Sequence, residues 1–160
     1  MRGILKAIGI ITVVFLVAAQ FARINRTNPP VESDVPAPGN VKAALRAACY
    51  DCHSNETTWP WYSHVAPASW LLGYDVSEGR EELNFSTWQR YDTAKQQKKL
   101  KETVETLNDG EMPPWYYSIM HSTARLADKD REAIVTWARQ GRANVSISGA
   151  HAESGRPSED

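Results

Sequence analysis

Two cysteines and a histidine stand within one five-residue stretch, and they constrain this chain more than any other feature. The stretch reads Cys49-Tyr50-Asp51-Cys52-His53. At this spacing two thiols can form thioethers with the vinyl groups of one haem, while the histidine supplies an axial nitrogen to the iron. The chain of 160 residues contains only two cysteines, so both belong to this site and no disulfide framework remains. The motif predicts one covalent haem c per chain, bound by Cys49 and Cys52, with His53 as an iron ligand.

The same stretch allows two other chemistries. A Cys-x-x-Cys pair can be a redox dithiol, which usually follows a strand in a βαβ unit, and nothing in this sequence indicates such a unit. The pair can also hold zinc together with His53, in which case His64 or His121 could be the fourth ligand. Common zinc modules have a second close pair of ligands, and this chain does not. A zinc or thiol redox site therefore remains the alternative to haem.

An apolar run near the N-terminus predicts export, which attachment of haem c requires in bacteria. Residues 7–22 are almost entirely apolar and are flanked by Arg2 and Lys6 before them and by Arg23 and Arg26 after them. At ~1.5 Å per residue this run spans about 24 Å, slightly less than a hydrocarbon core of ~30 Å. We expect residues 1–26 to be a signal anchor, a single transmembrane helix of the bacterial inner membrane with the C-terminal part in the periplasm. Cleavage before Gln20, which would release an exported soluble protein, is the alternative.

The rest of the chain divides into three parts by composition. Residues 27–38 are rich in proline and predict an extended linker. Residues 39–143 have the size of one domain, and residues 144–160 are polar, small and predicted to be a disordered tail. The net charge of −1 and the lack of a basic stripe exclude a nucleic-acid-binding surface.

The 39–143 segment has helical periodicity throughout and no alternating strand pattern. Helices are expected to begin at Asn40, near Pro67, at Ser86 or Thr87, near Thr93 and at Asp128. The first would carry the haem motif at its C-terminal end, the second would reach about Asp75, and the last two would end near Leu107 and at Gly141. The predicted class is all-α, a helical domain around one covalent haem, preceded by the membrane helix.

Met112 is the best candidate for the second axial ligand of the iron. It lies in Gly110-Glu111-Met112-Pro113-Pro114, where the prolines restrict the backbone and can hold one side chain against a flat cofactor. The alternative for Met112 is gap filling in the core. His64 and His121 are the other candidates for the sixth position. Met1 and His151 lie in the predicted membrane segment and the predicted tail.

Three aromatic residues and one arginine have two possible roles each. Trp59, Trp61 and Tyr62 could wall the haem, with an indole N–H donating to a propionate, or could form an ordinary apolar cluster. Arg80 could neutralise a propionate or lie exposed to solvent.

The chain resembles class I cytochromes c and, more closely, a family of bacterial haem-binding domains that are membrane-anchored or exported. The residues that carry this resemblance are Asn28-Pro29-Pro30-Val31, Cys49 to Thr57, Trp59-Pro60-Trp61-Tyr62, Ala66-Pro67, Gly79-Arg80, Leu83-Asn84-Phe85-Ser86, Trp88, Met112-Pro113-Pro114, Tyr117, Ala124-Arg125-Leu126 and Trp137. The resemblance implies haem c on Cys49 and Cys52, with His53 as the proximal ligand and Met112 as the distal ligand. By analogy with cytochromes c it also implies electron transfer.

We therefore expect a one-electron carrier on the periplasmic side of the membrane, acting with unidentified redox proteins. No nucleophile, proton donor or paired carboxylates stand out in the sequence, so no enzyme is predicted. A haem-based sensor or ligand-binding domain, with a replaceable sixth ligand, is the alternative function.

Overall fold

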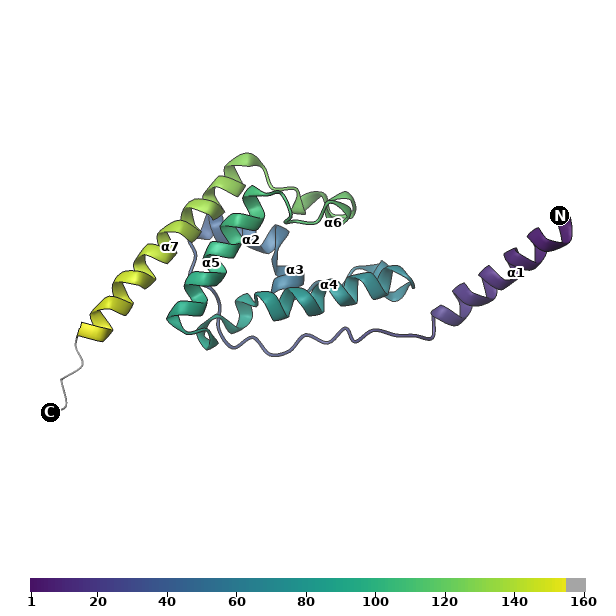
Figure 1. Ribbon diagram of the computed structural model, residues 1–160, viewed down its shortest axis with the longest axis horizontal. Helices are drawn as coiled ribbons and strands as arrows, with labels where there is room; N and C mark the ends of the chain where they lie inside the picture. Colours follow the sequence, from purple (N-terminus) through teal and green to yellow (C-terminus); the bar gives the residue numbers. More distant parts are fainter. Residues whose placement is uncertain (155–160) are drawn as a thin grey trace.

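The computed structural model describes residues 1–154, and this range contains helices and no strands (Figure 1). The α-helices are α1 (Arg2–Ala19), α2 (Gly39–Ala48), α3 (Tyr50–His53), α4 (Ala68–Glu82), α5 (Thr93–Asn108), α6 (Trp115–Met120) and α7 (Asp128–Ser154). Three 3₁₀ helices join them: η1 (Trp61–His64), η2 (Phe85–Arg90) and η3 (Ser122–Ala124). The all-α prediction is confirmed.

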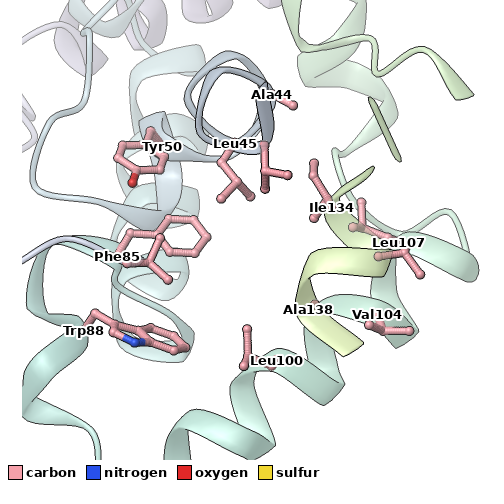
Figure 2. Close-up of a cluster of buried hydrophobic side chains, with 13 residues drawn as sticks. Ala44, Leu45, Tyr50, Phe85, Trp88, Leu100, Val104, Leu107, Ile134 and Ala138 are labelled. Atoms are coloured by element: carbon pink, nitrogen blue, oxygen red, sulfur yellow. The ribbon is translucent and has the colours of Figure 1, made fainter. Parts of the chain in front are cut away.

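The hydrophobic core lies where α7 packs against both α5 and α2 (Figures 1 and 2). Leu100, Val104 and Leu107 of α5 face Ile134 and Ala138 of α7. Aromatic residues extend the core into the Cys49–His53 motif. The ring of Tyr50, which belongs to the motif, stacks on the ring of Phe85 with centroids 5.0 Å apart. In Figure 2 the aromatic residues lie on one side of Leu45, which is fully buried, and the residues of α5 and α7 lie on the other side. The core therefore holds α2, which leads directly into the Cys-x-x-Cys-His motif.

Helix α7 continues beyond the point at which we expected it to end. The prediction placed its end at Gly141, but the helix reaches Ser154 and takes in most of the segment predicted to be a disordered tail. Gly141 has a packing role instead: a Cβ atom at this position would come within 3.0 Å of the Leu100 side chain on α5. Its missing side chain thus lets α5 and α7 approach closely. The last six residues of the predicted tail, 155–160, lie outside the described residues.

Helix α4 is also longer than predicted, since it passes Asp75 and ends at Glu82. The helix expected near Ser86 is a 3₁₀ helix, η2. Asn84 caps it, because its side-chain oxygen accepts a hydrogen bond of 2.9 Å from the backbone N–H of Ser86. The extra length of α4 brings its C-terminal half alongside α3.

The proline-rich segment 27–38 is extended, as its composition indicates, but it lies against the domain. Backbone N–H groups of Glu32 and Ser33 donate to the carbonyl of Ser86, at 3.0 and 3.1 Å. Val35 is buried in the core, and the indole of Trp137 donates to the carbonyl of Pro36 at 2.9 Å. These polar and apolar contacts fix the segment along the domain, so it is not a free linker.

Helix α1 is, within residues 1–154, the one helix long and apolar enough to cross a membrane. Its 18 residues span about 27 Å at ~1.5 Å per residue. A membrane span and a signal sequence both fit this helix. Its C-terminal end touches the domain: Gln20 exchanges two side-chain hydrogen bonds with the backbone of Ala66, at 3.0 and 3.2 Å.

Candidate functional site

The Cys-x-x-Cys-His motif lies across a break between two helices. Helix α2 ends at Ala48, Cys49 leaves helical geometry at φ −123°, and α3 begins at Tyr50. The backbone N–H of His53 still donates to the carbonyl of Cys49 at 2.8 Å. The two cysteines and the histidine are therefore held on one short turn, close to the end of the first domain helix as predicted.

His53 is oriented by the backbone of α4. Its Nδ1 atom lies 2.8 Å from the carbonyl oxygen of Gly79 and 3.1 Å from that of Leu83. Because carbonyls only accept hydrogen bonds, these partners assign the proton to Nδ1 and leave Nε2 free as a donor to a metal. Burial lowers the pKa of His53, although the two carbonyls act in the opposite direction. The ring is thus held in the neutral form that binds iron.

Gly79 makes this arrangement possible. A Cβ atom on this residue would lie 2.6 Å from the carbonyl oxygen and 3.0 Å from the carbonyl carbon of Cys52. Only glycine permits α4 to approach α3 so closely. The contact places the Gly79 carbonyl against the His53 ring.

Two neighbouring cavities open beside His53. One has a volume of about 240 Å³, and Cys49, Leu45 and Phe85 are among its walls. The other has a volume of about 180 Å³ and is lined in part by Cys52 and Tyr117. Both cavities are lined by four common residues: Ala48, His53, Glu82 and Met112.

Met112 lies on the same two cavities as His53, whereas the competing histidines do not. The loop before it turns at Gly110, whose φ of +72° favours glycine, and Glu111 is anchored by a 3.0 Å hydrogen bond to the carbonyl of Thr106. Met112 keeps 37% of its surface exposed. His121 stacks on Tyr117 with ring centroids 4.1 Å apart, and His64 lines a separate cavity beside Gln20.

The cysteine environment gives the zinc and thiol alternatives no support. Burial raises the pKa of Cys49 and of Cys52 to about 12 in each case, so both thiols stay protonated at neutral pH. The attacking thiol of a redox dithiol requires the thiolate form, which needs a lowered pKa. Among residues 1–154, no group of three or more His, Cys, Asp and Glu side chains could hold a metal ion.

The aromatic residues after the motif do not line these two cavities. Trp61 is 74% exposed, Tyr62 lies with its hydroxyl 3.3 Å from His121 Nε2, and Trp59 lines a different cavity. Arg80 contacts the protein itself: it donates to the Ser54 carbonyl and to the Thr57 hydroxyl, at 2.8 and 2.9 Å. The haem-wall role proposed for the aromatic residues therefore has no basis in this geometry.

Two side chains near the cavities, Tyr117 and Lys99, were given no role by the sequence analysis. The Tyr117 hydroxyl donates to a carboxylate oxygen of Asp51, between the two cysteines, at 2.6 Å. Burial, followed by this hydrogen bond, raises the pKa of Tyr117. Lys99 lines the larger cavity, nearly buried, with its ammonium 2.9 Å from Glu102 and 3.3 Å from Glu82. The Tyr117–Asp51 pair has no recognisable sequence signal, because its partners are 66 positions apart. Lys99 and Glu102 have the i, i+3 spacing of neighbours on one helix, which is a signal that the sequence does carry.

These residues fit a haem. The neutral histidine presents Nε2, the surrounding walls are largely apolar, and the two cysteines lie one on each cavity beside it. A haem needs an axial donor and an apolar slot, and two thiols beside the slot are the groups that covalent attachment of haem c would use.

Comparison with known proteins agrees with this geometry. The sequence pattern of the haem-binding domain family matches residues 14–140. The chain is also 25% identical over 103 residues to the cytochrome c peroxidase Ccp of Escherichia coli (strain K12). That similarity covers 62% of this chain but 22% of the relative, so the chain matches about a fifth of that protein's length. No solved structure matches the chain significantly. With four-fifths of its length matched to one family pattern, and a site that fits the cofactor in that family's name, the chain belongs to the haem-binding domain family.

Proposed function

We propose that this protein is a membrane-anchored c-type cytochrome domain that transfers single electrons on the periplasmic side of a bacterial inner membrane. The observation that carries the proposal is that His53 and Met112 line the same two cavities, while Cys49 and Cys52 stand on one cavity each. In this arrangement Cys49 and Cys52 would hold a haem through two thioethers, and His53 and Met112 would supply its iron ligands.

The chain's own residues then do three things. Cys49 and Cys52 fix the cofactor, so the domain keeps it without strong non-covalent binding. Gly79 and Leu83 hold the His53 ring through Nδ1 and direct Nε2 to the ligand position. Met112 supplies a thioether sulfur, a ligand that raises the reduction potential relative to a second histidine. The bound iron supplies a one-electron Fe(III)/Fe(II) couple.

Peroxide reduction is a second candidate, favoured by the name of the matched E. coli relative. Converting one hydrogen peroxide to two waters consumes two electrons and two protons, and peroxide must first reach an open position on the iron. Met112 lines both cavities beside His53, where it would fill that position. A single-electron carrier is therefore the better match, and a peroxidase role would require Met112 to leave the iron.

The test uses the full chain, produced in bacteria that export and mature c-type cytochromes. We expect haem-dependent staining after denaturing electrophoresis, an intact mass increased by one haem, and a redox titration that follows a one-electron Nernst curve. The matched control is the double variant Cys49→Ser, Cys52→Ser, which should lose the stain and the added mass. An unstained wild type with two titratable thiols would overturn the haem c assignment. Rapid peroxide-dependent oxidation of the reduced protein would favour the second candidate.

A further inference from the structure

A polar cavity of about 230 Å³ lies where α1 meets the domain, away from the haem cavities. Its walls include Gln20, Arg23 and Arg26 from the chain after α1, and Ser63 and His64 from η1. The junction is fixed, because Gln20 is hydrogen-bonded to Ala66 and Arg26 donates to the carbonyl of Ser63 at 3.0 Å. The cavity is thus a built feature of the fold.

The cavity is cationic. None of the described residues that line it is acidic, and within residues 1–154 neither Arg23 nor Arg26 forms an ion pair with a carboxylate. Ser63 is fully buried, and its hydroxyl finds no hydrogen-bond partner in the described part of the chain. Two arginines and a serine that line one cavity are suited to the oxygens of a phosphate group.

The position of the cavity points to the source of that phosphate. It adjoins the C-terminal end of α1, the end of a membrane-length apolar helix. The N-terminal end of α4 and helix α6 lie on the side of the domain that faces α1 (Figure 1). Trp61 and Trp115, in η1 and α6, are each 74% exposed, and tryptophan favours the membrane–water interface.

We propose that this cavity binds the phosphate of an anionic membrane phospholipid and so fixes the domain at the bilayer surface. The inference rests on the proposed membrane anchor. A free phosphate ion shares the same chemistry, but the position at the end of α1 favours the lipid.

The experiment is native mass spectrometry of the full haem-loaded chain, released from detergent in the presence of phosphatidylglycerol. Parallel samples contain phosphatidylcholine or inorganic phosphate as the probe. The variants are Arg23→Gln alone and Arg23→Gln with Arg26→Gln. Arg139→Gln, an exposed position on α7, is the control with the same change of charge. Because Arg23 is exposed and the haem spectrum reports folding, the single variant remains informative if the double variant is unstable.

We expect the wild type and Arg139→Gln to retain phosphatidylglycerol in preference to phosphatidylcholine, and the Arg23 variants to bind it about tenfold more weakly. Equal retention by all variants would overturn the site. Tight binding of inorganic phosphate that displaces the lipid would overturn the lipid as its occupant. The mass of the same ions shows whether residues 1–19 are present, so loss of the anchor is detected separately, and the haem spectrum reports the haem function independently of both.

Discussion

The Nδ1 atom of His53 lies 2.8 Å from the carbonyl oxygen of Gly79, and the two residues belong to helices that touch through the backbone of Cys52. One glycine thus performs two tasks: it permits the close approach of α3 and α4, and it orients the histidine. Orientation of a ligating imidazole through its second nitrogen fixes the tautomer and the direction of the metal-binding nitrogen. The orientation of His53, the proposed iron ligand, therefore depends on a residue outside the proposed ligand set.

Replacement of Gly79 by alanine tests this dependence. The new Cβ atom would lie 2.6 Å from the Cys52 carbonyl oxygen, so α3 and α4 must separate. We expect a loss of stability of about 1–3 kcal/mol despite the better helix propensity of alanine, and a smaller fraction of haem-loaded protein. Denaturant unfolding and the ratio of haem absorbance to protein measure both effects. Gly39→Ala is the control, because nothing lies within 4 Å of a Cβ atom there. Equal effects at the two positions would refute the packing role.

Replacement of Met112 by alanine tests the sixth ligand. We expect the variant to lose the weak long-wavelength band that methionine sulfur gives to ferric haem, and its midpoint potential to fall by an amount on the order of 100 mV. Met120→Ala is the matched control, because Met120 is exposed on α6 and lines neither haem cavity. If the band is absent from the wild type, or survives in Met112→Ala, then Met112 is not the ligand and the sensor alternative gains support.

The sequence located the residues of this site whose signal is local, and their role in holding haem stays a prediction. A few neighbouring residues are enough to recognise the spacing of Cys49, Cys52 and His53. The same is true of the restrained loop around Met112. Gly79 was not recognised as an orienting residue from its position alone, because a glycine inside a helix has no local signature and its role arises from the approach of α3.

The errors in the predicted fold also arise from contacts between residues that are distant in the sequence. Residues 27–38 were assigned as a linker from their prolines, and the contacts of Val35 and Pro36 with the distant helix α7 could not be read from composition. The end of α7 was placed at Gly141 because glycine commonly terminates helices. Packing against Leu100 instead uses that glycine inside the helix.

The ion pair that fixes the N-terminal segment predicts a pH-dependent stability. The Asp34 carboxylate lies 2.7 Å from the Lys42 ammonium and accepts a hydrogen bond from the Tyr50 hydroxyl. Burial works to raise the pKa of Asp34, but these two partners outweigh it, and the pKa is lowered from 3.8. Because its pKa is lower in the folded state, the ionised Asp34 carboxylate stabilises the protein at pH values above 3.8. This stabilisation is lost as the pH falls through the lowered pKa and the carboxylate is protonated.

We therefore expect Asp34→Asn to lower the free energy of unfolding at pH 7 by no more than about 1 kcal/mol, because the carboxylate is partly exposed to solvent. The difference from wild type should disappear at a pH below the lowered pKa. Denaturant titrations across the acid range measure this. Asp109 is exposed and forms no ion pair within residues 1–154. The control variant Asp109→Asn should therefore show no such dependence on pH. A difference between Asp34→Asn and wild type that is constant with pH would contradict the assignment.

Arg80 tests how the N-terminal segment is held to the turn that contains Cys49, Cys52 and His53. Its guanidinium donates to the Ser54 carbonyl at 2.8 Å, to the Asn28 side chain at 2.8 Å and to the Thr57 hydroxyl at 2.9 Å. Lysine keeps the charge but cannot reproduce the planar fork that reaches these partners together. Arg80→Lys should therefore lower the free energy of unfolding by about 1–3 kcal/mol and should speed hydrogen exchange in residues 27–30 and 54–57. Arg139→Lys, exposed on α7, should leave both measurements unchanged. If Arg80 instead held a haem propionate, the variant would shift the midpoint potential and leave exchange in residues 27–30 at the wild-type rate, so the two roles separate in a single variant.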